Sequence, residues 1–551
     1  MFAHRCRLLL TLVAACVLAL PAVADEKPQP RLTHQMVPMQ DGTKLATDIY
    51  LPASGDGPFP VLLSRTPYGK AATAAVAAAA CARGYAVVSQ DIRGRGKSEG
   101  SPAIIFRNDG WGKVHDGQDT IAWVGRQPWC NGKVGSFGGS ALGIVQNMTA
   151  PGAPEALQAQ LVQVACSDMY AQGAYEGGAW RKALLEDWLR ATGMTDVNLK
   201  TFVAHPRYDS FWADMNPEAQ ASRVNAPAVY FGGWYDIFLQ GTINEFVAVQ
   251  DHGGPRARGR CRLVIGPLAH GPFTELKYPA NSRTKMPRAA DAFAWFDYTL
   301  RGKDNAVAHE KPVQYYVMGD PTEAGAPGNY WRGADTWPPP AAVTPFYLHT
   351  DGKLVQGQAP DGEGSRSFEY DPEKPVPTVG GQELFLARGP MDQRKVESRP
   401  DVLVFTTDVL AKPVEVTGRI TAKLFVSSDC PDTDFTVKLT DVYPDGRSML
   451  VTDGIRRARY RRSFEREDFL EPGKVYELSV DLWSTSLVFN KGHRIRVDVS
   501  SSNAPRFEPN PNTGHAFRAD KETRVATNTV HCSRGQASHV LLPIVTAGGG
   551  K

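Results

Sequence analysis

The strongest candidate for chemistry in the sequence is Ser140, which lies in the run Val134-Gly-Ser-Phe-Gly-Gly-Ser-Ala-Leu-Gly143. An apolar, strand-like stretch precedes this serine and a helix-compatible stretch follows it. A serine nucleophile needs a tight strand-to-helix turn that exposes its Oγ, and glycine neighbours avoid the clashes that such a turn would cause. The spacing is Gly-x-Ser-x-x-Gly rather than Gly-x-Ser-x-Gly, so a glycine-rich turn with an incidental serine is the alternative.

A serine hydroxyl is too weakly acidic to attack a carbonyl group at neutral pH without a base, and the base needs a carboxylate that orients it. In one large class of serine hydrolases, the acid and then the histidine follow the serine along the chain. Downstream of Ser140 one strand-like run ends at Asp236, and the next ends at His270. Each alone could be an ordinary turn acid or loop histidine. Three candidates in this order, each at a strand end, predict a Ser140, His270, Asp236 triad.

The elements around these residues alternate between strand and helix patterns. Helix-compatible segments lie at 71–82 and 119–124. Strand-like runs lie at 45–50, 61–64, 85–89, 134–137, 226–231 and 262–265. This order predicts a largely parallel sheet flanked by helices, with catalytic groups in the loops that follow the strands.

We expect four parts along the chain. These are a signal peptide at 1–24, an α/β domain at 25–150 and 224–335, a helical cap inserted at 151–223, and an all-β domain at 336–551. Strand signals fade in the cap, where aromatic residues gather and would either line a pocket or form the core of the cap: Trp180, Trp188, Phe202, Tyr208, Phe211 and Trp212. Short alternating strands, such as 420–426 and 435–439, predict the all-β domain.

The first residues have the pattern of an export signal. Arg5 and Arg7 precede an apolar run of 13 residues, 8–20, and small residues then lead to Asp25. A helix that spans a membrane needs about 20 apolar residues, so the run predicts a cleaved signal peptide and an exported chain, periplasmic or secreted, with no membrane span. The alternative is a lipoprotein signal cut before Cys16, which would leave an apolar mature N-terminus.

Composition narrows the classes of partner. The chain has 551 residues with 61 Lys and Arg against 58 Asp and Glu, and this net charge of +3 is too small to bind a polyanion such as nucleic acid. The six cysteines outside 1–24 are scattered and form no metal-binding pattern, so we expect no metal, and no individual disulfide is predicted. The basic run 456–462 is followed by three acids, which favours cross-strand ion pairs over a polyanion site.

Several motifs resemble those of the cocaine esterase and X-Pro dipeptidyl-peptidase family of α/β-hydrolases, which also includes α-amino-acid ester hydrolases and glutaryl cephalosporin acylases. The three triad motifs are Gly-Gly-Ser140-Ala-Leu-Gly, Gly-Gly-Trp-Tyr-Asp236 and Gly-Pro-Leu-Ala-His270. Further segments resemble the family in the same order: 65–68, 91–100, 127–135, 492–496 and 510–514. The resemblance covers almost the whole chain after the signal peptide.

This resemblance implies an α/β-hydrolase fold with an inserted helical cap and a C-terminal, galactose-binding-like jelly-roll. It also implies that the hydroxyl of Tyr68 and the backbone N–H of Ala141 form the oxyanion hole. Cocaine esterase-like members often have tyrosine after the nucleophile, where this chain has Ala141. The backbone N–H of Ala141 could still donate a hydrogen bond to the oxyanion, but the wall of the pocket would differ.

The absence of certain acidic residues after Asp236 narrows the substrate class. The α-amino-acid ester hydrolases resemble one another in acids placed two and three residues beyond the triad aspartate, where this chain has Phe238 and Leu239. An ammonium buried without a counter-charge is costly, so α-amino acyl substrates and X-Pro peptides are disfavoured. Asp168 and Glu176 in the cap would either supply an acidic patch or be solvated or structural acids.

The sequence therefore predicts an exported serine hydrolase that cleaves small-molecule carboxylic esters through an acyl-enzyme, with amides left open. No metal or organic cofactor is expected, and the oligomeric state is open. One alternative is an X-Pro dipeptidyl-peptidase or a β-lactam acylase. The alternative from another class is a non-catalytic protein that binds carbohydrate or cell-envelope material.

Overall fold

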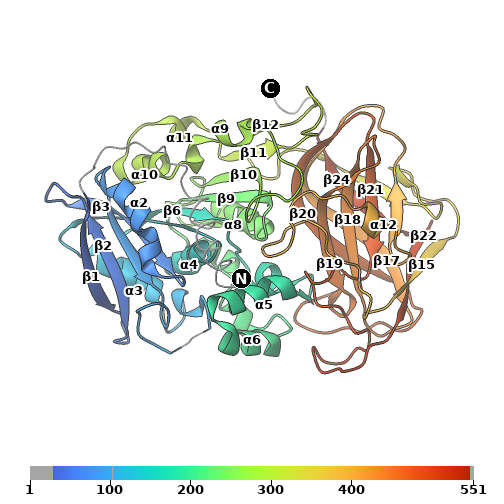
Figure 1. The fold of residues 1–551 in the computed structure, drawn as a ribbon, viewed down its shortest axis with the longest axis horizontal. Coiled ribbons are helices and arrows are strands. Elements are labelled where there is room, and N and C mark those ends of the chain that lie inside the picture. The colour runs from blue at the N-terminus through green and yellow to red at the C-terminus, as the bar shows by residue number, and fades with distance from the viewer. Residues whose placement is uncertain (1–28, 102–103, 546–551) are drawn as a thin grey trace.

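The computed structural model describes residues 29–101 and 104–545. Figure 1 shows two parts side by side, an α/β part in blue to green and a β-rich part in orange to red. The predicted signal peptide and the alternative lipoprotein site at Cys16 lie outside the described residues. No helix within the described residues is long and apolar enough to cross a membrane.

A ten-stranded sheet forms the centre of the α/β part. In spatial order it contains β1 (Arg31–Pro38), β2 (Lys44–Leu51), β4 (Ala86–Asp91), β3 (Phe59–Thr66), β5 (Cys130–Gly139), β6 (Leu157–Gln163), β9 (Ala228–Tyr235), β10 (Arg262–Ala269), β11 (Val313–Val317) and β12 (Tyr330–Ala334). The strands from β4 to β11 pair in parallel, and antiparallel strands close both edges. Central strands such as β9 are buried along their whole length, as expected when helices cover both faces.

Helices cover the two faces of this sheet. Apolar side chains of α2 (Ala74–Cys81) and α10 (Ala292–Arg301) share one core with the sheet, and α3 (Asp116–Gly125), α4 (Ala141–Thr149) and α8 (Leu239–His252) pack elsewhere on it. Shorter helices connect these elements: η1 (Lys70–Thr73), η2 (Arg107–Asp109), η3 (Ala150–Gly152), α9 (Asn281–Thr284), η6 (Arg288–Ala290) and α11 (Ala306–His309). The expected parallel sheet between helices is confirmed.

The segment between β6 and β9 is mostly helical. It contains η4 (Met169–Ala174), β7 (Tyr175–Glu176), β8 (Ala179–Trp180), α5 (Lys182–Thr192), α6 (Thr195–Ala204), α7 (Ser210–Ala213) and η5 (Glu218–Arg223). The helical cap predicted at 151–223 therefore begins too early, because β6 within that range is a central strand of the sheet. Its sequence Leu-Gln-Ala-Gln-Leu-Val-Gln has one β-branched residue and three glutamines, so it carries little strand signal.

The β-rich part contains two sheets with antiparallel strand pairs. The larger sheet comprises β13 (Ala342–Leu348), β14 (Leu354–Gln356), β15 (Ser365–Tyr370), β17 (Val414–Ser428), β20 (Tyr476–Phe489), β22 (Ala526–Ser533), β23 (Gln536–Ala537) and β24 (His539–Ile544). The smaller comprises β16 (Leu403–Thr406), β21 (Arg494–Ser500), β18 (Asp434–Val442) and β19 (Ser448–Arg457), with α12 (Arg394–Glu397) and η7 (Ala458–Tyr460) in connections. The all-β prediction is confirmed, and the jelly-roll topology stays a prediction.

The basic run 456–462 is tied to carboxylates. Arg457 at the end of β19 pairs with Asp434, its cross-strand partner on β18. Arg459 lies in η7 rather than in the strand and pairs with Asp432 and Glu467. Cross-strand pairing is therefore confirmed for Arg457, while the later arginines form ion pairs from a turn.

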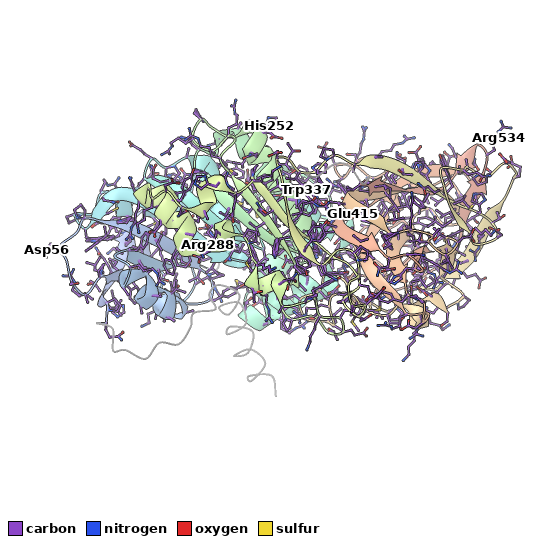
Figure 2. The ribbon with its side chains drawn as sticks, turned by 90° about the horizontal axis from the view of Figure 1, so that it is seen from above. Asp56, His252, Arg288, Trp337, Glu415 and Arg534 are labelled. Atoms are coloured by element: carbon purple, nitrogen blue, oxygen red, sulfur yellow. The ribbon has the colours of Figure 1, made fainter. Side chains whose placement is uncertain are left out.

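Aromatic rings and an ion pair join the two parts. Trp337, which follows β12, packs against Trp234 with ring centroids 5.7 Å apart. Arg332 on β12 forms an ion pair with Glu415 on β17. Figure 2 shows Trp337 and Glu415 at this junction, between the ends marked by Asp56 and Arg534. The β-rich part is therefore packed close enough to the large sheet to contribute to a site there.

Candidate active site

Ser140 occupies a strained turn between β5 and α4. Its φ and ψ angles are 57° and −127°, a combination that is rare for any residue other than glycine and is often found at functional sites. The neighbouring glycines are required, because a Cβ on Gly138 would lie 2.5 Å from that of Leu142, and one on Gly143 would lie 2.8 Å from that of Ala165. The glycine-rich spacing therefore serves a turn that presents Ser140 above the sheet.

The three predicted triad residues lie together in a continuous hydrogen-bonded chain. The Oγ atom of Ser140 is 2.9 Å from Nε2 of His270, and Nδ1 of His270 is 2.7 Å from Oδ2 of Asp236. The side chains of His270 and Asp236 are 4% and 0% exposed. Each follows the carboxyl end of a parallel strand, β10 for His270 and β9 for Asp236, which is why residues so distant in sequence meet. This geometry suits a base that can take the proton of Ser140.

Local contacts fix the acid and the imidazole. The second carboxylate oxygen of Asp236 accepts a hydrogen bond from the backbone N–H of Phe238 at 2.8 Å. The ring of Phe238 meets the His270 ring edge-on, with centroids 5.9 Å apart. On the other side, Arg388 of the β-rich part donates to the carbonyl oxygen of His270 at 3.3 Å. The position of His270 is therefore set from both parts of the molecule.

Tyr68 and Ala141 border the same serine. Tyr68 lies in the loop after β3, and its hydroxyl interacts with the side chain of Ser140. Burial raises the pKa of Tyr68 to about 12, so the phenol keeps its proton at neutral pH and remains a donor. Ala141 is the first residue of α4, where a backbone N–H has no acceptor within the helix. Both predicted oxyanion donors thus adjoin Ser140.

Ser140 lines two cavities. The larger has a volume of about 360 Å³, and its wall is mostly apolar, with Val76, Phe137, Leu142 and Leu384 among its residues. The smaller, of about 30 Å³, is lined by Ala141, Leu184, Leu185, Phe238 and other apolar groups. A carbonyl carbon at Ser140 would therefore have room for one substituent on each side.

Sequence reasoning missed two residues that line both cavities. Trp188 comes from α5 and was one of several cap aromatics, whose roles the sequence could not separate. Four of the other rings, Trp180, Phe202, Phe211 and Trp212, are buried in the core. Leu384 comes from the β-rich part and has no distinguishing sequence signal. The cap aromatics thus include both a pocket wall and a core.

The cap acids do not line either cavity. Asp168 accepts hydrogen bonds from the backbone of Tyr170 and Ala171 at the start of η4. Glu176 is buried and pairs with Arg181 and Arg506. Within the described residues, no aspartate or glutamate lines the two cavities beside Ser140. The structural reading of both acids is therefore favoured over an acidic patch for substrate.

Groups that could bind a metal lie elsewhere. In the described chain, Asp320, Glu323 and His493 place one potential ligand atom each within 4.8 Å of the others, and none lines either cavity beside Ser140. All six described cysteines are buried and free. The expectation that the reaction needs no metal or organic cofactor stays a prediction.

Comparisons with known proteins agree along nearly the whole chain. Residues 41–199 and 189–272 match the family described as X-Pro dipeptidyl-peptidase (S15 family), and 305–541 match the X-Pro dipeptidyl-peptidase C-terminal non-catalytic domain. The cocaine esterase of Rhodococcus sp. (strain MB1 Bresler) is 36% identical, with 93% of this chain and 98% of that protein covered.

Two solved structures are similar over the same extent. An aminopeptidase from the marine sediment archaeon Thaumarchaeota archaeon has a TM-score of 0.81 at 26% identity, and an α-amino acid ester hydrolase has a TM-score of 0.79 at 27% identity. Each alignment covers 96% of this chain and 99% of the other. The fold is that of these α/β-hydrolases, with the second, antiparallel β domain at the C-terminus.

Proposed function

This chain belongs to the cocaine esterase and X-Pro dipeptidyl-peptidase family of serine hydrolases, and from that premise we propose that it is an exported carboxylesterase that acts through an acyl-enzyme on Ser140. One observation carries the proposal. The hydrogen-bonded chain from Ser140 through His270 to Asp236 opens between two largely apolar cavities. Such a chain activates a hydroxyl, and cavities on both sides of it accommodate the two halves of an ester.

The first half of the reaction forms the acyl-enzyme. Oγ of Ser140 attacks the ester carbonyl carbon while Nε2 of His270 takes the hydroxyl proton, and Asp236 stabilises the imidazolium. The carbonyl oxygen becomes an oxyanion, which accepts hydrogen bonds from the hydroxyl of Tyr68 and the backbone N–H of Ala141. The intermediate then expels the alcohol, which leaves with the proton from His270.

The second half releases the acid. A water molecule attacks the acyl carbonyl while His270 takes one of its protons, and the same two donors hold the second oxyanion. Collapse of this intermediate breaks the bond to Oγ, and the proton returns from His270 to Ser140. The products are a carboxylic acid and the regenerated enzyme, so no external redox partner enters the balance.

The cavities favour esters that carry no ammonium group and have one small substituent. A volume of about 30 Å³ accepts only a short chain, while about 360 Å³ accepts a bulky group. Two of the similar structures are named aminopeptidase and α-amino acid ester hydrolase. These names point to substrates with a free amino group, which is an ammonium group at neutral pH. In the described part of this chain no carboxylate lines the cavities, and an unpaired buried ammonium is costly. Aminoacyl and X-Pro substrates are therefore disfavoured.

Export is part of the proposal and rests on residues 1–24. The two arginines, the apolar run 8–20 and the small residues before Asp25 support a signal peptide. Expression of the full chain with N-terminal sequencing of the product tests it. Cleavage before Asp25 is expected, and an intact N-terminus or lipidated Cys16 would contradict it.

The proposed chemistry is tested with a fluorophosphonate probe, followed by mass spectrometry of the labelled peptide. We expect the label on Ser140 and none on Ser140→Ala. Hydrolysis of p-nitrophenyl acetate and p-nitrophenyl butyrate should exceed that of an aminoacyl p-nitroanilide. Ordinary turnover by Ser140→Ala would remove this serine from the mechanism, and a folded protein with neither label nor turnover would favour a binding protein.

A further inference from the structure

We infer that Trp188, on the cap helix α5, is a positioning residue that points the hydroxyl hydrogen of Tyr68 at the oxyanion site. The inference rests on the proposed function, because it assigns a role within the same site. It goes further by making the cap part of the catalytic apparatus rather than only a wall of the pocket. The argument begins with one hydrogen bond between the cap and the loop after β3.

Nε1 of Trp188 lies 3.0 Å from the hydroxyl oxygen of Tyr68. An indole N–H can only donate, so the tyrosine oxygen must be the acceptor of this bond. A phenol has a single hydrogen, and that hydrogen cannot point along the direction from which the indole N–H approaches. The hydroxyl also interacts with the side chain of Ser140. The hydrogen of Tyr68 is therefore directed away from Trp188, which leaves it available on the side of Ser140, where the carbonyl oxygen of an ester attacked by Ser140 would lie.

The position of Trp188 is itself restrained. Its ring stacks on Phe106, with centroids 6.0 Å apart and an interplanar angle of 15°, and Phe106 is buried. Arg95 ties the same helix to the tyrosine loop. Its Nη2 donates to the carbonyl oxygen of Thr192 at 2.7 Å, and its Nε donates to that of Pro67 at 3.2 Å. The end of α5 and the residue before Tyr68 are thus held by one guanidinium.

The hydrogen bond from Trp188 also strengthens the donor. Withdrawal of electron density from the phenol oxygen polarises its O–H bond, and linked hydrogen bonds reinforce one another in a buried site. A donor that already points at the oxyanion needs no reorganisation when charge develops, which is the condition under which such donors lower the barrier. Trp188 should therefore affect kcat more than KM.

The test is a double-mutant cycle with p-nitrophenyl acetate. Trp188→Phe removes the N–H and keeps an aromatic ring against Phe106, and we expect kcat to fall about tenfold with KM changed less than about threefold. In the Tyr68→Phe background the same substitution should change kcat less than about twofold, because no hydroxyl remains to be oriented. The matched control is Trp180→Phe, which removes an indole N–H that donates to Glu186. It should leave kcat unchanged.

Equal losses of kcat in both backgrounds would show that Trp188 only shapes the pocket and would overturn the inference, as would an unchanged kcat in Trp188→Phe. If Trp188→Phe fails to fold, benzothienylalanine at position 188 replaces the N–H with sulfur in a ring of nearly the same shape, and the same cycle applies. Fluorophosphonate labelling of Ser140 in each variant separates the two proposals. Equal losses of kcat in both backgrounds, with Ser140 still labelled, would reject only the role of Trp188. Absence of labelling in the wild-type chain would reject the proposed function.

Discussion

Among the described residues, two buried histidine–aspartate pairs have the same contact at Nδ1 of the histidine and different contacts at Nε2. In the α/β part, Nδ1 of His270 is 2.7 Å from Asp236, and in the β-rich part, Nδ1 of His493 is 2.8 Å from Asp441. The side chains of the two histidines are 4% and 1% exposed. Their Nε2 atoms have different neighbours. That of His270 lies 2.9 Å from Oγ of Ser140, and that of His493 lies 3.8 Å from Asp320.

The difference shows that a buried pair of this kind does not by itself make a catalytic site. Nε2 of His270 faces a hydroxyl at the border of two cavities, so a proton can move between the histidine and a reacting group. His493 packs under the ring of Tyr443, with centroids 4.5 Å apart, and it lines neither of those cavities. The first pair is placed for proton transfer, and the second holds together the loop before β21 and strand β18.

Matched substitutions of the two histidines should give the largest difference in kcat between the two pairs. His270→Asn removes the base, and we expect kcat for p-nitrophenyl acetate to fall by about 10⁴-fold or more. His493→Asn keeps a donor for Asp441 and should leave kcat within about threefold of wild type. Circular dichroism checks that both variants are folded. A folded but inactive His493→Asn would show that the second pair takes part in the reaction.

The aspartates should show the same contrast with a smaller effect. Asp236→Asn leaves the imidazole without the charge that stabilises its protonated form, and a loss of kcat of about 10³- to 10⁴-fold is expected. Asp441→Asn should alter thermal stability and spare kcat. Steady-state kinetics and melting curves on both variants provide the measurement. Similar kinetic losses in the two would contradict the division of roles.

Removal of one tyrosine hydroxyl beside each pair should have a still smaller effect. Tyr68→Phe deletes a proposed oxyanion donor, and we expect kcat to fall by about 10²- to 10³-fold. Tyr443→Phe is the matched control and should keep kcat, because Tyr443 packs against His493 and neither residue lines the cavities beside Ser140. Measurement of kcat and KM with the same ester distinguishes them. An unchanged rate in Tyr68→Phe would leave the oxyanion to backbone donors.

The predictions from sequence succeeded where local pattern and chain order carry the information. Ser140 was recognised because the glycines that permit its turn are visible as spacing, and Asp236 and His270 because parallel strands deliver residues to one edge of the sheet. The same logic, however, gives no reason to examine His493, which precedes β21 and meets Asp441 on β18, the neighbouring strand of the same sheet. Its environment depends on packing between elements, which periodicity does not encode.

The parts that sequence could not supply are those built by contacts between distant segments. Strand β6 was missed because its glutamines hide the strand pattern, and its burial depends on partners such as the backbone of Gln146, which accepts from Gln160. Leu384 reaches the cavities from the β-rich part, so its role follows from how the two parts pack. Trp188 differs from the other cap aromatics in lining the two cavities and in its hydrogen bond to Tyr68, and both depend on tertiary contacts.

The smallest expected effect concerns how the second pair responds to pH. Burial raises the pKa of Asp441 to about 6, and although burial lowers the pKa of His493, the hydrogen bond and charge of Asp441 outweigh it and raise that pKa overall. The folded chain thus keeps protons on both groups at pH values where the unfolded chain has lost them. Stability from the pair is then fully present below the ordinary pKa of aspartate and falls as the pH rises through about 6 and beyond the ordinary pKa of histidine.

The measurement compares the melting temperature of the wild type with that of a His493→Gln, Asp441→Asn double variant between pH 4 and pH 8. The variant keeps polar side chains at both positions but cannot titrate there. We expect the advantage of the wild type to shrink with rising pH by about 1–3 kcal/mol in the free energy of unfolding. An advantage that grows with pH would mean that the pair is held as a neutral histidine beside a carboxylate. The two pairs would still differ in what Nε2 faces, which is the Ser140 hydroxyl beside two cavities for His270 and Asp320 for His493.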